Sequence, residues 1–297
     1  MEIVTIITPT YNRKVELEKL FHSLCNQRSE NFRWLVVDDG SEDGTEKYIE
    51  DIKKSAKFKI DYIKKENGGK HTALNLGVQR INTELTIIVD SDDILLPNAV
   101  EEISEIYEKY KNYQEIASFT FLKMKADGKI VVPLEKKEFV ANYIQYRIKG
   151  NRPGDMAEVY RTAVLKEYPF PEYENERFIS EDVCWIEIGK KYNSVYIDKA
   201  IYQCEYLNGG LTYNDKPLKF KSPNGSMMRG RQLMSSECGI KVNIKGAIIY
   251  NCYSMETDSN KVPLLSAYQK LLVYLTKPVG VYFNKKWKCM NKEKVQG

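Results

Sequence analysis

Two short apolar segments of this chain end directly in clusters of carboxylates. Residues 34–37 run into Asp38 and Asp39, and residues 85–89 run into the acidic segment 90–93. Apolar runs of this length bounded by turn signals are typical of buried β-strands. Because an uncompensated charge is costly to bury, we expect these acids at strand ends, facing solvent, a ligand or a cation.

The first hundred residues alternate between strand-like and helix-like segments. Strands are expected at residues 3–8, 34–37, 59–63 and 85–89, with apolar residues at helical spacing between them, as in 14–27. This alternation predicts parallel pairing, with helices on both faces of the sheet. Ligands of such sheets bind beyond the carboxyl ends of the strands, so we expect the acids at one shared edge.

The pattern changes after residue 97. Two segments separated by an Asp-Gly turn predict an antiparallel hairpin, and helices are expected later in the chain. We therefore predict an α/β fold with a mostly parallel sheet, a small antiparallel portion and a helical C-terminal extension. The expected elements are hairpin strands at 116–122 and 129–132, a strand at 156–160, a helix at 181–191 and further helices from 216 onward.

Composition narrows the class of protein. The net charge is +4, yet residues 216–297 carry fifteen Lys and Arg against four acids, which leaves an acidic body and a basic tail region.

Six cysteines without a C-x-x-C pair, beside two histidines, argue against a zinc site and favour free thiols in a reducing compartment. Residues 1–4 lack the layout of a signal peptide, and no apolar run reaches the roughly 18 residues of a membrane helix. We predict a cytoplasmic protein.

Four motifs, in order, resemble those of a family 2 glycosyltransferase with the GT-A fold. They are residues 6–13 (Ile-Ile-Thr-Pro-Thr-Tyr-Asn-Arg), 37–41 (Val-Asp-Asp-Gly-Ser), 67–75 (Asn-Gly-Gly-Lys-His-Thr-Ala-Leu-Asn) and 90–93 (Asp-Ser-Asp-Asp). The resemblance covers the first third of the chain, and beyond it Ser180-Glu181-Asp182 is the one further landmark.

The resemblance implies a nucleotide-binding site around Asp39, with Thr8 and Tyr11 lining the same pocket. We include Asp38 and Ser91 in this donor site. A carboxylate can accept a strong, charge-assisted hydrogen bond from a uracil imide or a ribose hydroxyl. The alternative is that Asp38 and Asp39 only begin a turn.

The resemblance further identifies Asp90 and Asp92 as the metal-binding D-x-D motif. Carboxylates repel a diphosphate unless a divalent cation lies between them, and Mg²⁺ or Mn²⁺ prefers such oxygen ligands. Asp92 is the stronger candidate for direct coordination. The alternative is helix capping ahead of Pro97, which would account for Asp93.

Lys70 follows two glycines at an expected helix N-terminus. Free backbone N–H groups and the helix dipole favour anions there, so Lys70 is a candidate for contacting a phosphate of the donor. A plain turn at Gly68-Gly69 is the competing interpretation.

Glu181 and Asp182 open another expected helix. An acceptor hydroxyl must lose its proton as it attacks the anomeric carbon, and a carboxylate within hydrogen-bond reach can take it. The resemblance implies that Asp182 is this base and that Glu181 is its neighbour or orienter. Acids in the first helical turn serving only as caps are the alternative.

We predict three parts: a nucleotide-sugar-binding half at 1–96, an acceptor-binding half at 97–214 and a helical extension at 215–297. The predicted reaction moves one sugar, with inversion, from a UDP-linked donor to a hydroxyl of a glycan or lipid-linked acceptor in surface polysaccharide or glycolipid synthesis. No nucleic-acid partner is expected.

Two other functions stay open. One is a catalytically inactive nucleotide- or glycan-binding module. The other is a nucleotidyltransferase, which would favour a basic, Gly-rich loop where this chain has Pro9-Thr10-Tyr11.

The basic tail region also has two interpretations. It is either a solvated helical face or a peripheral contact with an anionic membrane at the inner face. The second rests on lysines such as Lys285 and Lys286, which flank Tyr282, Phe283 and Trp287.

Overall fold

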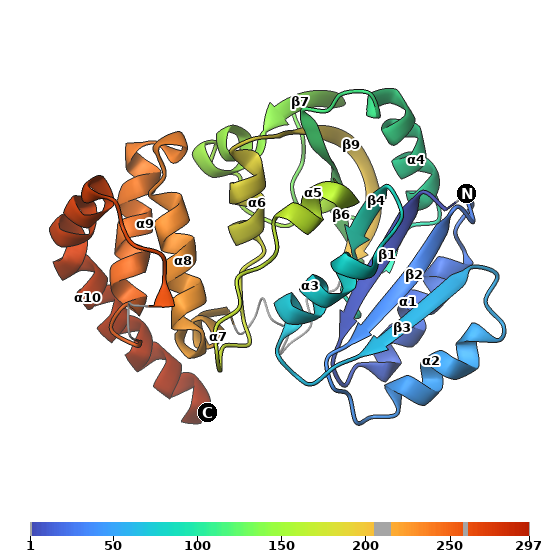
Figure 1. Cartoon of the computed structure of the whole chain (residues 1–297), viewed down its shortest axis with the longest axis horizontal. Coiled ribbons are helices and arrows are strands. Elements are labelled where there is room, and N and C mark those ends of the chain that lie inside the picture. Colours follow the sequence, from blue (N-terminus) through green and yellow to red (C-terminus); the bar gives the residue numbers. More distant parts are fainter. Residues whose placement is uncertain (1, 205–214, 258–260, 297) are drawn as a thin grey trace. The chain divides into compact units, whose positions relative to one another are not determined.

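The computed structural model describes residues 2–204, 215–257 and 261–296 and divides the chain into two compact units (Figure 1). Unit 1 comprises Met1–Asn142, Arg152–Pro169 and Lys191–Glu205, and unit 2 comprises Tyr143–Asn151, Phe170–Lys190 and Tyr206–Gly297. The units are thus interleaved along the chain. The predicted division into donor, acceptor and C-terminal parts concerns function and stays a prediction, and its boundary at residue 214 lies outside the described residues.

Unit 1 is built, in its described residues, around a nine-stranded sheet of order β3-β2-β1-β4-β8-β6-β9-β5, with β7 paired to β9. β1 pairs in parallel with β2 and β4, and β2 pairs in parallel with β3. The parallel pairing predicted for the first strands is therefore confirmed. The strands are β1 (Val4–Thr10), β2 (Phe32–Asp38), β3 (Lys59–Lys64), β4 (Leu85–Ile88), β5 (Ile94–Leu95), β6 (Ile116–Lys125), β7 (Glu138–Asn142), β8 (Ala157–Arg161) and β9 (Asn193–Cys204).

The antiparallel portion differs from the predicted hairpin. β8 pairs antiparallel with both β4 and β6, and the other edge of β6 is taken by β9, in parallel. Residues 129–132 contribute, among the described residues, an isolated bridge between Met124 and Ile130. The hairpin prediction is therefore confirmed only at the end of β6, where the Lys125 N–H donates a 2.9 Å hydrogen bond to Lys129 O and the Val131 N–H donates a 3.0 Å hydrogen bond to Lys123 O. Earlier in β6 the prediction is wrong, because this strand, buried over its first seven residues, is an interior strand whose edges are filled by segments far along the chain.

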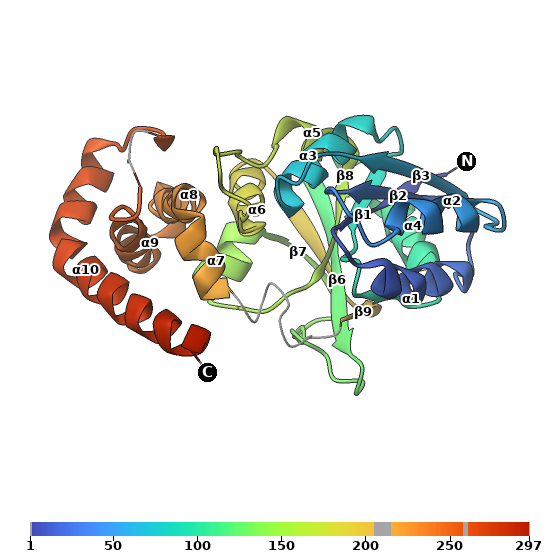
Figure 2. The ribbon, with the colours of Figure 1, turned by 90° about the horizontal axis from the view of Figure 1, so that it is seen from below.

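Helices cover both faces of the sheet, as predicted. α1, α2 and α4 pack onto one face, where the apolar stripe of α1 shows the 3-and-4 spacing of a core-facing helix. α3 packs onto the other face, where a Cβ on Gly77 would lie 2.5 Å from Ile7 Cδ1 and 2.8 Å from Val37 Cγ2. Glycine thus allows close approach of α3 to the sheet. Figure 2 shows α3 on the side of the sheet opposite α1. The helices are α1 (Lys14–Cys25), α2 (Thr45–Lys53), α3 (Lys70–Arg80), α4 (Ala99–Tyr110) and α5 (Thr162–Glu167).

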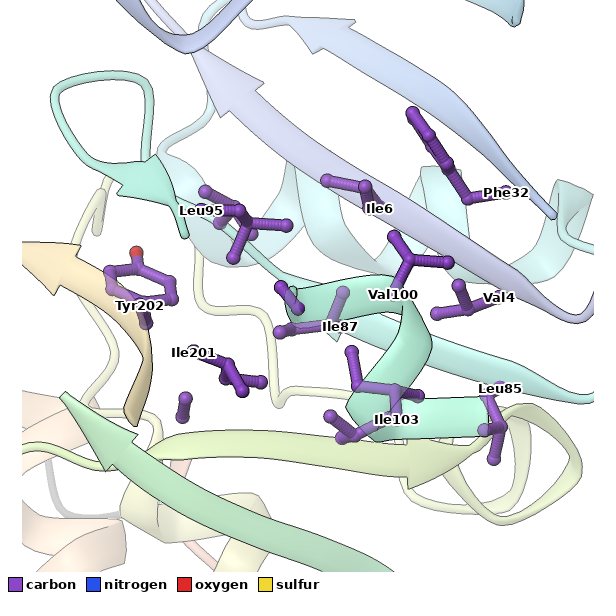
Figure 3. Packing of buried hydrophobic residues seen from close by; sticks show 14 of the residues in the cluster. Val4, Ile6, Phe32, Leu85, Ile87, Leu95, Val100, Ile103, Ile201 and Tyr202 are labelled. Carbon is purple, nitrogen blue, oxygen red and sulfur yellow. The ribbon is translucent and has the colours of Figure 1, made fainter. Parts of the chain in front are cut away.

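The core of unit 1 lies between the sheet and the first of these helical layers (Figure 3). Val4 and Ile6 of β1 and Ile87 of β4 are fully buried against Val100 and Ile103 of α4. Burying a side chain of this size contributes about 1.5–3 kcal/mol relative to leaving it exposed. This packing fixes the strands whose carboxyl ends carry the acids.

Unit 2 is helical in its described residues, which confirms the predicted helical C-terminal part. α8 packs on α9, and a Cβ on Gly230 would lie 2.8 Å from Gly246 O, so small residues allow this contact. None of the helices described in the chain is both long enough and apolar enough to cross a membrane. The elements are η1 (Ile144–Lys149), α6 (Asp182–Gly189), α7 (Asp215–Lys221), α8 (Pro223–Leu233), η2 (Ser236–Cys238), α9 (Ile240–Tyr253) and α10 (Ala267–Gln296).

Candidate active site

The loop that follows β1 contacts both acidic loops of unit 1. The Asn12 N–H donates a 2.8 Å hydrogen bond to Ser41 Oγ in the loop after β2. The Arg13 guanidinium, one residue later, lies 2.7 Å from Asp92 Oδ2 in the loop after β4. The carboxyl ends of three parallel strands therefore form one polar edge, as the sequence predicted.

Asp38 is buried and holds the turn after β2. Its Oδ1 accepts a 2.7 Å hydrogen bond from the Ser41 N–H, and its Oδ2 accepts a 2.6 Å hydrogen bond from the Tyr62 hydroxyl. Burial, together with the Asp38 carboxylate, raises the pKa of Tyr62 well above its usual value, so this phenol stays protonated as a donor. These contacts match the turn interpretation for Asp38.

Asp39 organises the glycine loop that precedes α3. Its carboxylate lies 2.8 Å from Lys65 Nζ and accepts hydrogen bonds from the N–H groups of Gly68 (2.9 Å) and Gly69 (2.7 Å). Gly69 has a φ of +97°, which a residue without Cβ adopts readily. The N–H groups of Gly68 and Gly69, at the helix start where we expected a bound anion, therefore donate to the carboxylate of Asp39. The sequence did not reveal the role of Lys65, because a single lysine after a strand belongs to no recognisable motif.

The remaining donor-site candidates have different surroundings. Thr8 is fully buried, and its hydroxyl accepts a 3.0 Å hydrogen bond from Trp34 Nε1, so the predicted pocket-lining side chain is a core residue. Tyr11 is 49% exposed, which leaves its ring available for stacking. Ser91 is buried within the acidic loop.

The predicted metal ligands lie together. Ligand oxygens of Asp90, Asp92 and Asp93 all lie within 4.8 Å of one another. The Lys70 ammonium forms an ion pair with Asp90. Burial alone would raise the pKa of Asp90, but Lys70 and Lys123 outweigh it and hold the pKa below its usual value. This carboxylate is therefore ionised and able to bind a cation.

Two further residues that the sequence did not reveal support the acidic loop. The Tyr202 hydroxyl on β9 accepts a hydrogen bond from the Asp90 N–H and donates one to Asp93. The Lys123 ammonium on β6 lies 4.0 Å from the centroid of the Tyr202 ring. Tyr202 follows the acidic loop by more than a hundred residues, so no local pattern could connect them.

Asp93 does not cap a helix. α4 begins at Ala99, its N-terminal flanking residue is Asn98, and no side chain there makes a capping hydrogen bond. The capping interpretation for Asp93 is therefore wrong, and this acid belongs to the carboxylate cluster.

The predicted base lies in unit 2. Asp182, at the first position of α6, receives contacts from Arg229 of α8: Nε lies 2.9 Å from Oδ1 and 2.7 Å from Oδ2, and Nη2 lies 2.7 Å from Oδ2. Ser180 Oγ donates a further 2.7 Å hydrogen bond to Oδ1. Burial would raise the pKa of Asp182, but Arg229 outweighs it and keeps the pKa below its usual value. Glu181 flanks α6 without a side-chain capping bond, so the contacts here are not those of a plain cap.

Two aromatic residues of the basic tail region pack inside unit 2. The ring centroids of Phe283 and Trp287 lie 5.2 Å apart, and that of Trp287 lies 6.5 Å from Tyr253. Tyr282 alone of the three predicted membrane-contacting rings is mostly exposed. The predicted membrane contact therefore has less support than the sequence suggested.

Comparisons with known proteins place this chain among glycosyltransferases. A model of glycosyl transferase family 2 matches residues 5–166. An uncharacterized glycosyltransferase of Rickettsia bellii is 27% identical over 252 residues, which are 84% of this chain and 33% of that protein. The GalNAc(5)-diNAcBac-PP-undecaprenol beta-1,3-glucosyltransferase of Campylobacter jejuni is 26% identical over 215 residues, 67% of this chain and 63% of that protein. The chain spans about a third of the length of the first curated relatives that it matches.

Solved structures share its fold. Residues 1–349 of Staphylococcus aureus TarS, in complex with UDP, align with a TM-score of 0.62 at 18% identity, covering 98% of this chain and 92% of that one. The mannosyltransferase PcManGT of Pyrobaculum calidifontis, in complex with GDP-Man and Mn²⁺, aligns with a TM-score of 0.57 at 15% identity, covering 97% and 83%.

Proposed function

This chain belongs to glycosyl transferase family 2 and has the α/β GT-A fold, and from that premise we propose that it transfers a sugar from a UDP-linked donor to an acceptor hydroxyl. The observation that carries the proposal is the cluster of Asp90, Asp92 and Asp93 at the carboxyl edge of a parallel sheet, beside Lys70 and Arg13. Clustered acids next to the cationic side chains of Lys70 and Arg13 suit a ligand that combines a divalent metal with a diphosphate.

The nucleoside of the donor is assigned to the loops after β1 and β2. Asp39 supplies a carboxylate of low exposure, and Tyr11 supplies an exposed ring. A buried carboxylate suits the imide and hydroxyl donors of uridine, and an aromatic ring suits its base. The complex of TarS with UDP supports this choice of nucleotide.

A divalent cation fits the carboxylate cluster. Three carboxylates within reach of one ion offer the hard oxygen ligands that Mg²⁺ and Mn²⁺ prefer, and we assign Asp90 and Asp92 to hold it. Such a metal would stabilise the negative charge that develops on the leaving nucleoside diphosphate. Lys70 and Arg13 each pair with one of these acids and carry the charge needed to contact a phosphate.

Asp182 is proposed as the base, with Glu181 beside it. Transfer with inversion needs a carboxylate that accepts the proton of the acceptor hydroxyl, and Asp182 places one at the first position of α6. The predicted acceptor is a glycan or a lipid-linked glycan in surface polysaccharide or glycolipid synthesis. The undecaprenol-linked substrate in the name of the Campylobacter relative supports a lipid-linked acceptor.

A thermal-shift panel tests the donor and metal assignments. UDP and GDP would each be added to the intact chain with Mn²⁺ and with EDTA. We expect UDP with Mn²⁺ to raise the melting temperature most and EDTA to remove that gain. Equal, small shifts under all conditions would contradict the donor site. Release of UDP from UDP-sugars in the presence of an acceptor would then separate an enzyme from an inactive binding module.

A further inference from the structure

The two carboxylates assigned to the metal each form an ion pair with a cationic side chain of unit 1. The Arg13 guanidinium lies 2.7 Å from Asp92 Oδ2, and the Lys70 ammonium pairs with Asp90. Hard divalent cations also bind carboxylate oxygens. A metal ion and these two side chains therefore compete for the same two carboxylates.

Arg13 and Lys70 are attached to backbone that is held in place. Asn12, just before Arg13, has a φ of +50°, and its N–H donates to Ser41 Oγ in the loop after β2. Lys70 is the first residue of α3 and follows Gly69, whose N–H donates to the carboxylate just after β2. The side chains of Arg13 and Lys70 are 27% and 25% exposed, so neither is locked in the core. Each can therefore change its partner by side-chain rotation alone.

The charge around the acidic loop disfavours a divalent ion that arrives alone. If such an ion took Asp90 and Asp92, the two cations would lose these carboxylates and lie close to two added positive charges. The Lys123 ammonium is a further positive charge here: burial would lower its pKa, but Asp90 and Asp93 outweigh burial and raise it. Like charges at short range repel most strongly where water is partly excluded. We therefore expect the bare ion to bind weakly.

A diphosphate changes this balance of charge. Its oxygens offer new anionic partners to the Arg13 guanidinium and the Lys70 ammonium, and guanidinium groups form paired hydrogen bonds with phosphate. Its negative charge also offsets that of the metal. The two side chains can then leave their carboxylates to the metal and still contact an anion, so metal and diphosphate should strengthen each other's binding.

We propose that Arg13 and Lys70 are exchangeable counter-ions of the metal ligands, so that the site binds a divalent cation and a nucleoside diphosphate together and either one alone only weakly. The inference rests on the proposed function, because it takes Asp90 and Asp92 as the metal ligands. It adds a regulation of that site, in which two positioning residues hold the carboxylates until a metal and a diphosphate arrive together. By thermodynamic linkage, each of the two ligands must raise the affinity for the other by the same factor.

Titration of Mn²⁺ tests this exchange without any turnover. Mn²⁺ is added to the intact chain with and without saturating UDP, and the unbound ion is measured by its electron paramagnetic resonance signal. We expect Arg13→Met to bind Mn²⁺ alone about tenfold more tightly than the wild type and to lose about tenfold of the gain in Mn²⁺ affinity that UDP provides. Arg13→Lys should keep the wild-type pattern. The control is Arg28→Met, because Arg28 is 68% exposed and lies 4.0 Å from Glu101, so both affinities should change less than about twofold.

A purely structural role predicts a different result. If Arg13 only holds its loop, Arg13→Met would bind Mn²⁺ alone as weakly as the wild type or more weakly, and that outcome would overturn the proposal. Lys70→Met is an independent test at Asp90, which decides the question if Arg13→Met does not fold, and it too should bind Mn²⁺ alone more tightly. Absence of UDP binding with Mn²⁺ in the wild type would end the proposed function. Normal UDP binding with Mn²⁺, beside unchanged affinity of the variants for Mn²⁺ alone, would end this inference only.

Discussion

The Tyr202 hydroxyl donates a 2.7 Å hydrogen bond to Asp93 Oδ2, across 109 residues of sequence. The same oxygen accepts a 3.1 Å hydrogen bond from the Asp90 N–H, so one phenol spans the start and the end of the acidic loop. Burial and the two acids raise the pKa of Tyr202 well above its usual value, which keeps the proton on the donor. The loop is therefore held at both ends by a residue from a distant strand.

Tyr202→Phe should weaken metal-dependent UDP binding. The substitution keeps the ring in the core but leaves Asp93 without this donor, and losing an outer partner of a metal site typically costs about ten- to a hundredfold in affinity. Calorimetric titration of UDP with Mn²⁺ measures the effect. Tyr48→Phe is the control, because the Tyr48 hydroxyl makes no hydrogen bond among the described residues. Unchanged affinity in Tyr202→Phe would remove this support from the site.

Asp92→Asn should abolish most of the gain in UDP affinity that Mn²⁺ provides. The amide has the size of the acid but lacks the charge that holds a hard cation and that pairs with Arg13. We expect UDP affinity in EDTA to change far less than affinity in Mn²⁺. Asp51→Asn, on the exposed side of α2, should behave like the wild type. A full metal effect in Asp92→Asn would exclude it as a ligand.

Lys65→Met should destabilise the fold and weaken nucleotide binding together. It leaves the nearly buried Asp39 carboxylate without its counter-charge, which we expect to cost about 2–3 kcal/mol, somewhat less than for a fully buried pair because Lys65 is partly exposed. Urea denaturation measures the free energy of unfolding. The matched variant is Lys64→Met, which removes an exposed lysine paired to Glu46 and should change stability by less than about 1 kcal/mol. Equal losses in both variants would contradict the role of the Lys65–Asp39 pair.

The ion pair of Asp182 predicts a pH dependence of stability. The pKa of Asp182 is lowered in the folded chain, chiefly because Arg229 outweighs the effect of burial, with Ser180 and Lys219 acting in the same direction. A lowered folded pKa adds stability above the unfolded carboxyl pKa of about 3.9, and that stability is lost as the pH falls through the folded value. The difference in unfolding free energy between wild type and Asp182→Asn should thus be largest near neutral pH and shrink in acid. If this difference in unfolding free energy stayed constant down to pH 2, the Asp182–Arg229 pair would make no pH-dependent contribution to stability.

The sequence was sufficient to predict the strands that carry the acids. Each strand is a short apolar run, and the charge that follows it has to leave the core, so both the parallel order and the shared edge could be inferred. The cluster of Asp90, Asp92 and Asp93 follows from these constraints.

The partners of those acids could not be predicted. Tyr202, Lys65 and Arg229 are single residues whose roles arise from tertiary contacts, and none of them belongs to a periodic pattern or a motif. The predicted hairpin at 129–132 forms only at the end of β6, for a related reason. Local turn chemistry was correct at Asp127-Gly128, but pairing of β6 with β8 and β9 decided the sheet.

The place of β9 has a consequence for how the chain matures during synthesis. This strand pairs with β5, β6 and β7, and it carries the phenol that fixes the acidic loop more than a hundred residues upstream. A nascent chain that has emerged only as far as α5 contains all three aspartates of the cluster. It lacks Tyr202, whose hydroxyl bonds to Asp90 and Asp93. The proposed metal site should therefore be completed late in translation, when residue 204 has left the ribosome, rather than when the acids themselves appear.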